Sequence, residues 1–186
     1  MSIKFLNQRN WKILFSEFPT YQVELIKEMV DLLPPAGIYS RERICHFLAQ
    51  IAHETGGFYW DEELASGEEY EGRADLGNTQ PGDGKRFKGR GLIQLTGRAN
   101  YRQYGRWLDL PLEENPELAR KPRVALKIAL LYWNANDLNY WADKGDLIKI
   151  TRAINGGMAG YQDRLSWLNR IMTQYDRWLA RTHNNI

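Results

Sequence analysis

A glutamate at the end of an amphipathic helix has the clearest chemical potential in this sequence. Glu54 follows the apolar positions Phe47 and Ile51, and at about 100° per residue it lies roughly 20° from Phe47 around the helix. Partial desolvation of a carboxyl group favours its protonated form, the form that a general acid needs. The geometry leaves a second interpretation open, in which Glu54 turns back to water or pairs with an arginine.

A second carboxylate is available in the acidic segment that follows. Seven acids stand between positions 61 and 75, namely Asp61, Glu62, Glu63, Glu68, Glu69, Glu71 and Asp75. Because Gly56 and Gly57 end the helix, a turn can bring one of them back across a groove from Glu54. Two carboxyl groups about 6.5–9.5 Å apart are typical of an inverting glycosidase, which needs room for one water. The other acids are interpreted as solvated loop charges.

Metal and nucleotide chemistry are not supported by the spacing of the remaining motifs. A zinc site beginning at His53 requires a second histidine where Gly57 stands. His53 is therefore interpreted as a hydrogen-bonding support for the site. The glycines Gly89 and Gly91 lack the third glycine of a dinucleotide-binding loop. We expect no metal and no cofactor.

A run of basic residues follows the acidic segment in the sequence. No acid stands between Gly84 and Arg102. The bases of this run are Lys85, Arg86, Lys88, Arg90, Arg98 and Arg102. Salt bridges to the acids just upstream are one interpretation, and recognition of phosphate or of an acidic polymer is the other.

Helical periodicity predicts the elements that must position these residues. Apolar spacing indicates helices over 21–33, over 41–55 after the partial N-cap Ser40, over 122–137 and over 147–154; a last helix runs through 165–179. Residues 58–96 lose this period and are predicted to be irregular, with one short β-hairpin. The expected fold is mainly α, a single domain over residues 1–186 around a polar, loop-rich cleft.

Composition limits the class of protein. The 186 residues carry a net charge of only +2, so we expect no nucleic-acid partner. No run approaches the roughly 20 apolar residues that span a bilayer, so we expect no stable membrane insertion. Residues 1–18 lack the apolar run of a signal peptide, and the single cysteine, Cys45, excludes an internal disulfide. The last helix is moderately basic, with Arg164, Arg170, Arg177 and Arg181 against Asp163 and Asp176. These charges allow contact with anionic lipid or lipopolysaccharide, although a core helix with a solvated face is the preferred interpretation.

Three blocks in order resemble one known family. The blocks are 53–57 (HETGG), 88–101 (KGRGLIQLTGRANY) and 154–157 (INGG). They are similar to the catalytic domain of the family 19 chitinases, and most similar to the branch of bacteriophage endolysins. The resemblance implies a lysozyme-like α+β fold. The lack of disulfides departs from the cross-linked plant members and favours a phage or bacterial enzyme. It places Glu54 as the general acid and Glu63 as the base, with Glu69 and Glu71 as rivals for the second role.

The resemblance also implies the residues that bind substrate. Thr96 is placed to hold the attacking water. The positions matching substrate-binding residues are His53, Gln94, Asn100, Tyr101, Asn155 and Arg164, of which Arg164 either contacts sugar or supports the acid. Ala99 departs from the tyrosine of the plant enzymes, so one sugar contact is not expected here.

An endolysin origin implies a setting for the reaction. The enzyme is expected to be a monomer stored in the host cytoplasm and released to the cell wall by a separate holin. Its expected substrate is the β-1,4-linked glycan backbone of peptidoglycan, with bacterial lysis as the outcome. Chitin hydrolysis and a non-catalytic peptidoglycan-binding module are the alternatives, and the sequence leaves open which glycosidic bond is cut.

Overall fold

The computed structural model describes residues 2–15 and 20–183. Helices carry the regular structure, and the described residues form only isolated β-bridges in place of strands. The predicted mainly α fold is therefore confirmed. The chain divides into two units, residues 1–58 with 130–186 (unit 1) and residues 59–129 (unit 2). A single domain over the whole chain stays a prediction.

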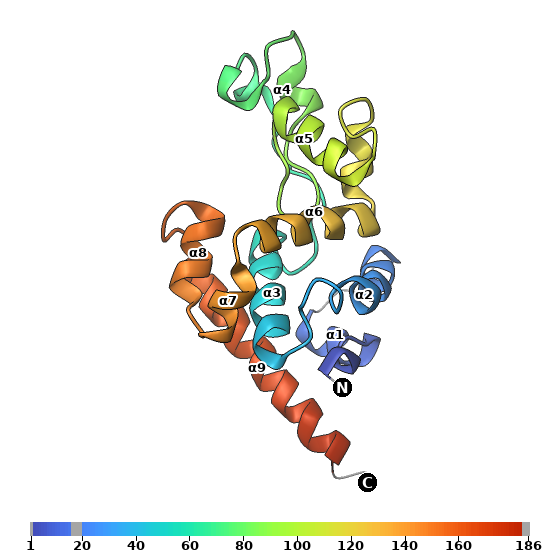
Figure 1. Ribbon diagram of the computed structural model, residues 1–186, viewed down its shortest axis with the longest axis vertical. Helices are drawn as coiled ribbons and strands as arrows, with labels where there is room; N and C mark the ends of the chain where they lie inside the picture. Colours follow the sequence, from blue (N-terminus) through green and yellow to red (C-terminus); the bar gives the residue numbers. More distant parts are fainter. Residues whose placement is uncertain (1, 16–19, 184–186) are drawn as a thin grey trace. The chain divides into compact units, whose positions relative to one another are not determined.

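Unit 1 is built from helices at both ends of the chain (Figure 1). They are η1 Ser2–Phe5, α1 Gln8–Leu14, α2 Thr20–Leu32, α3 Arg41–Glu54, α7 Leu138–Asp143, α8 Leu147–Asn155 and α9 Tyr161–His183, with the last part of α6 Pro122–Ala135. The predicted helices over 21–33, 41–55, 122–137 and 147–154 are thus present. Helices α1 and α7 were not predicted, because each is too short to show a clear apolar period.

The two ends of α3 form as the sequence predicts. The Ser40 hydroxyl accepts the Arg43 backbone N–H at 3.3 Å, and every residue from Ile44 to Ala52 is buried. Beyond Glu54, the N–H of Gly57 donates to the Ala52 carbonyl at 2.7 Å. Gly57 has φ +80, a conformation that glycine adopts without strain. This termination leaves Glu54 as the last helical residue.

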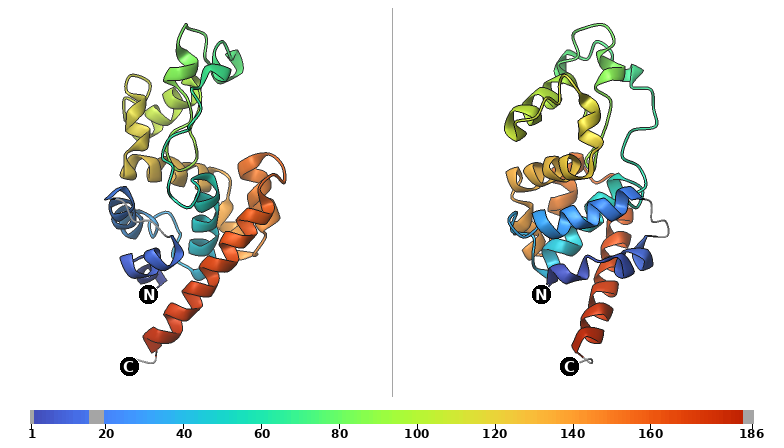
Figure 2. Two further views of the ribbon diagram at one scale, coloured as in Figure 1. Left: turned by 180° about the vertical axis from the view of Figure 1, so that it is seen from behind. Right: turned by 90° about the vertical axis from the view of Figure 1, so that its right-hand side faces the viewer.

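Helix α9 packs along α3 and completes the core of unit 1 (Figure 2). Its residues Leu168, Ile171 and Tyr175 are buried, and the ring of Tyr175 stacks against Phe5 at 4.9 Å between centroids. The interpretation of α9 as a core helix is confirmed. Within the described residues, no helix combines the length and apolar character that crossing a membrane requires.

Unit 2 begins with the irregular segment that the sequence predicts. It contains η2 Glu68–Tyr70, η3 Ala74–Leu76 and α4 Asp83–Arg86, followed by α5 Arg98–Leu108 and η4 Pro116–Arg120. In place of the predicted hairpin, Arg90 forms isolated bridges with Glu62 and Leu95. Helix α5 was not predicted, because it is rich in arginine and its buried face consists of two tyrosines and a glycine.

Candidate active site

Glu54 is held by a buried arginine on α9. Arg164 Nη2 donates to Glu54 Oε1, and Arg164 Nη1 donates to the amide oxygen of Gln50 at 2.6 Å. The Arg164 side chain is fully buried, whereas the Glu54 side chain is 23% exposed. Of the two alternatives left by the helix geometry, the arginine pair is the one observed. In the described part of the chain Oε1 alone is bonded, so Oε2 is the oxygen left for another partner.

A second pair joins the same two helices one residue earlier. His53 Nδ1 and Asp163 Oδ2 are 2.6 Å apart, with side chains 24% and 57% exposed. The pair agrees with the interpretation of His53 as a hydrogen-bonding support. An ideal Cβ on Gly160 would lie 2.4 Å from the imidazole ring. Glycine at this position therefore lets the loop before α9 pass close to His53.

Helices α6 and α8 contribute to the surroundings of Glu54. The Tyr132 hydroxyl donates to the Ala153 carbonyl at 2.6 Å. Burial raises the pKa of Tyr132, and the nearby charge of Glu54 raises that pKa further. Asn155, the last residue of α8, is exposed, so its side chain is available to a ligand.

In unit 2, Glu63 lies in a loop tied to Gly89. The Glu63 N–H donates to the Gly89 carbonyl at 2.9 Å, and the Gly89 N–H donates to Glu63 Oε2 at 3.0 Å. The Tyr70 hydroxyl donates to Glu63 Oε1 at 2.9 Å. Burial and this hydrogen bond raise the pKa of Tyr70 to about 12. Two donors therefore fix both carboxylate oxygens of Glu63.

The loop also orders the polar residues that the resemblance predicts. An ideal Cβ on Gly89 would lie 2.7 Å from Gln94 Oε1 and 3.1 Å from Glu63 Oε2. The Thr96 hydroxyl donates to the Gln94 carbonyl at 2.9 Å, and Asn100 Nδ2 donates to the Thr96 carbonyl at 2.8 Å. Gln94, Thr96 and Asn100 are partly exposed. The structure therefore brings Glu63 and these three residues together in unit 2.

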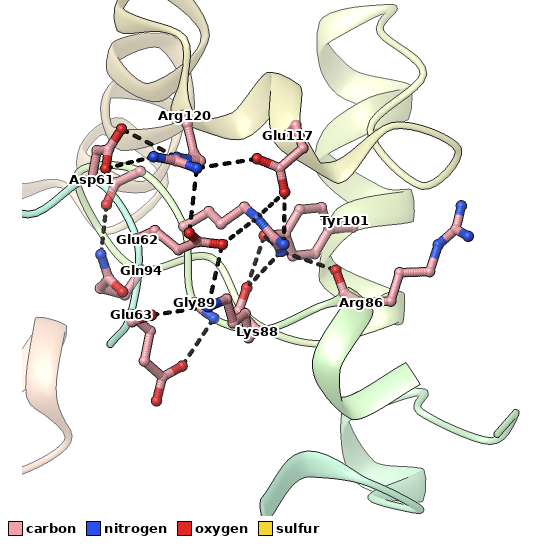
Figure 3. Close-up of polar contacts among 12 residues, drawn as sticks. Asp61, Glu62, Glu63, Arg86, Lys88, Gly89, Gln94, Tyr101, Glu117 and Arg120 are labelled. Carbon is pink, nitrogen blue, oxygen red and sulfur yellow. Dashed lines mark hydrogen bonds and ion pairs between the residues drawn. The ribbon is translucent and has the colours of Figure 1, made fainter. Parts of the chain in front are cut away.

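An ion-pair network removes two neighbouring acids from the candidates for the base (Figure 3). Arg90, whose side chain is 7% exposed, lies 3.2 Å from Glu62 and 2.8 Å from Glu117. Arg120 lies 3.1 Å from Asp61 and 3.3 Å from Glu62. Asp61 and Glu62 therefore neutralise arginines, whereas Glu63, which Figure 3 shows beside Gly89, lies outside the network.

The rival Glu71 has a structural role. Its carboxylate accepts the backbone N–H groups of Gly82 at 2.7 Å and Gly84 at 2.8 Å. This arrangement ties the loop before α4 to the segment after η2. Glu69 is exposed within η2.

The predicted substrate contact of Tyr101 is contradicted. Its side chain is fully buried, and its hydroxyl donates to the Lys88 carbonyl at 2.9 Å. Burial raises the pKa of Tyr101 to about 12. Tyr101 lies in the first turn of α5 and points into the interior of unit 2. It therefore supports the loop that contains Lys88 and Gly89. Arg164 is also fully buried. Of its two predicted roles, the structure is consistent with support of Glu54.

Three of the six bases of 85–102, Lys85, Lys88 and Arg90, pair with the acids just upstream, as the first interpretation predicts, whereas Arg86 donates to the backbone carbonyls of Glu113 and Glu114. Lys85 lies 2.8 Å from Glu68, and Lys88 lies 3.4 Å from Glu62. Arg98 and Arg102 instead share Glu113, at 3.1 Å and 2.7 Å. The hydrogen bond from Arg102, with the further bond from Arg98, lowers the pKa of Glu113 to about 2.

Sequence reasoning missed three supporting residues, Gln50, Tyr70 and Asp163. Only Gln50 carried a signal, because a polar side chain one turn before Glu54 on an apolar helix face is unusual. Nothing in the spacing of Tyr70 or Asp163 indicates a contact with Glu63 or His53.

Comparisons with known proteins define the class to which this fold and these residues belong. The model of the family described as Chitinase class I matches residues 36–144. A glycosyl hydrolase family 19 domain-containing protein of Haemophilus influenzae is 30% identical over 193 residues, covering 87% of this chain and 94% of that protein. The chain therefore belongs to glycoside hydrolase family 19 and is a glycoside hydrolase.

Chitinases are among the individual relatives. An endochitinase of Arabidopsis thaliana is 39% identical over 122 residues, covering 65% of this chain and 42% of the plant protein. The chain thus spans less than half the length of that relative. The crystal structure of chitinase C from Streptomyces griseus HUT6037 has a TM-score of 0.75 at 24% identity, with 92% of each chain covered, and so shares the fold.

Proposed function

We propose that this chain is an endolysin-type inverting glycoside hydrolase that cleaves β-1,4 bonds of the peptidoglycan glycan backbone. The observation that carries the proposal is the state of Glu54, anchored at Oε1 by buried Arg164 with Oε2 unbonded within the described residues. One fixed oxygen and one free oxygen give the carboxyl group a single direction for donating a proton. A general acid needs that property at the glycosidic oxygen.

The proposed reaction divides the work between two carboxyl groups. Glu54 donates its proton to the glycosidic oxygen as the bond to C1 breaks. Glu63, whose oxygens are fixed by Tyr70 and Gly89, accepts a proton from the water that attacks C1 from the opposite face. The Thr96 hydroxyl already donates to the Gln94 carbonyl, so its lone pairs remain to orient that water. The product has inverted anomeric configuration.

Peptidoglycan is proposed first as the substrate because the relative aligned over 94% of its own length is a bacterial protein, and peptidoglycan is the amino-sugar polymer of bacterial walls. We propose storage in the host cytoplasm and release to the wall by a separate holin. Chitin is the second candidate, since the Arabidopsis thaliana relative is an endochitinase. Both polymers share the β-1,4 linkage and the N-acetyl group.

Digestion of both polymers in parallel tests the proposal. Purified sacculi and colloidal chitin are incubated in H₂¹⁸O, and the products are analysed by mass spectrometry and by NMR of the first anomer formed. We expect ¹⁸O at a new reducing end from sacculi, with the α-anomer first, and the sugar at that end identifies the bond. Products from chitin alone would replace peptidoglycan by chitin. Saturable binding to sacculi without new reducing ends would indicate a binding module.

A further inference from the structure

Eight arginines of the described residues form an ion pair with a carboxylate. Within the same described residues, the exposed arginines on the surface shared by α1 and α9 do not, and neither do Arg86, Arg106 and Arg152. The arginines with a carboxylate partner within 4.0 Å are Arg41, Arg43, Arg73, Arg90, Arg98, Arg102, Arg120 and Arg164. Among the described residues no such partner faces Arg9 of α1 or Arg170, Arg177 and Arg181 of α9. All four are exposed. We call these four residues the arginine surface.

Helix α1 packs on α9 in unit 1 (Figure 2). Two hollows are lined by residues of the arginine surface there. The first, of about 320 Å³, has Arg170 and Arg177 beside Asn169, Thr173 and Gln174. The second, of about 260 Å³, has Arg9 and Arg181 beside Asn7, Asn10, Trp178 and Thr182. The described residues that line the two hollows include no carboxylate.

A third hollow shows that this composition is not general to the molecule. It has a volume of about 530 Å³ in unit 2 and also contains two arginines, Arg102 and Arg106. Its lining includes Asp109, Glu113 and Glu114, which balance the guanidinium charge. Of these three hollows, the two of the arginine surface combine paired guanidinium groups with amides and hydroxyls and have no acid among their described lining residues.

Guanidinium groups with neutral hydrogen-bond donors are the usual recognition elements for phosphate. On α9, Arg170, Arg177 and Arg181 follow at intervals of seven and four residues, which places them on one helix face over about 16 Å. Because the charges form a row, they match a chain of anions better than a single anion.

Two further observations select the kind of chain. The apolar residues Leu168, Ile171 and Tyr175 of α9 are buried in the core, so the exposed face lacks the apolar stripe that inserts into a bilayer. Trp178, which lines the second hollow, packs against Phe5 and Tyr175, and the Arg170 guanidinium lies over the ring of Trp167. Both indoles are partly buried, so the surface lacks the row of exposed aromatic faces on which successive nucleic-acid bases stack.

We propose that the arginine surface binds a phosphate-bearing polymer without bases, such as a polyol- or sugar-phosphate chain. Each hollow takes phosphate groups between two guanidinium groups, and the chain runs along α9. The site is independent of the proposed hydrolysis, because Glu54 and the loop of Glu63 do not line either hollow.

Long-chain inorganic polyphosphate is the probe for this site, with binding measured by fluorescence anisotropy. The test variant is R9Q/R170Q/R177Q/R181Q. The control variant, K27Q/R106Q/K121Q/K144Q, removes the same charge from exposed residues elsewhere. We expect the test variant to bind at least about tenfold more weakly than the native chain at about 0.1 M salt, and the control to lose less than about threefold. Equal losses would show that net charge alone binds the polymer and would overturn the proposal.

Three competing ligands define the class further. Poly-glutamate, phosphatidylglycerol vesicles and a thymidine 20-mer are measured with the same proteins, and each is expected to bind more weakly than polyphosphate. Tighter binding of poly-glutamate or of the vesicles, lost in the test variant, would overturn the assignment to a phosphate polymer. Tighter binding of the thymidine 20-mer, lost in the same variant, would overturn the assignment to a polymer without bases. Urea unfolding of each variant verifies the fold. If the fourfold variant is unstable, R177Q/R181Q carries the comparison, with an expected loss of at least about threefold.

Discussion

The pair between Arg164 and Glu54 predicts a measurable coupling of stability. E54Q keeps an acceptor for Arg164 Nη2 but leaves a fully buried guanidinium without its carboxylate partner. Breaking a buried pair costs about 3–5 kcal/mol, and because Glu54 is 23% exposed, we expect about 2–3 kcal/mol. R164M leaves the Gln50 amide oxygen without its donor, at about 1–3 kcal/mol.

A double-mutant cycle by urea unfolding at pH 7 measures this coupling. The double variant is expected to lose less free energy of unfolding than the sum of the single variants, by about 1–3 kcal/mol. The control is the pair Arg41 and Asp176, which joins the same two helices but has side chains 30% and 55% exposed. Its coupling is expected below about 1 kcal/mol. Additive effects of E54Q and R164M would refute the role of Arg164 as the anchor of Glu54.

Two further predictions concern pH and stability. Burial lowers the pKa of His46 from 6.5 to about 4, so between these values the unfolded chain binds more protons, and stability falls as the pH is lowered. H46L should flatten the change in unfolding free energy between pH 7 and 4, and an unchanged slope would contradict a buried neutral imidazole. The pKa of Glu113 is lowered from 4.5 to about 2, first by Arg102, so its contribution is complete above pH 4.5 and is lost towards pH 2. E113Q should therefore cost about 1–2 kcal/mol at pH 7 and much less at pH 2, and equal losses at both pH values would exclude the ionised carboxylate as the cause.

The elements that the sequence predicted are those with a long apolar period and a clear end. Helix α3 has both, with Ser40 at its start and Gly57 after its end. Helix α5 was missed because its interior contacts are made by Tyr101 and Tyr104 and by a close backbone approach at Gly105. Such contacts leave no apolar period to detect.

The sequence predicted the reactive carboxyl group of the candidate site, but not the contacts that hold that group in place. The angle of Glu54 on α3 and the end of the helix at Gly57 indicated a carboxyl group that is partly removed from solvent. Helix geometry left open an arginine partner without naming it, because Arg164 lies 110 residues away in the sequence; the family resemblance named Arg164 as a residue that contacts sugar or supports the acid. The assignment of Tyr101 failed for a related reason, since a motif gives the residue and only packing gives the direction of its side chain.

The hydrolytic rate of E54Q on sacculi is the most direct test of the account. The substitution keeps the size of the side chain and its hydrogen bond to Arg164 but removes the proton that Glu54 donates. With the fold verified by circular dichroism, we expect kcat to fall by at least about 10²-fold while KM changes little. A folded E54Q protein that retains native kcat would contradict the assignment of Glu54 as the general acid.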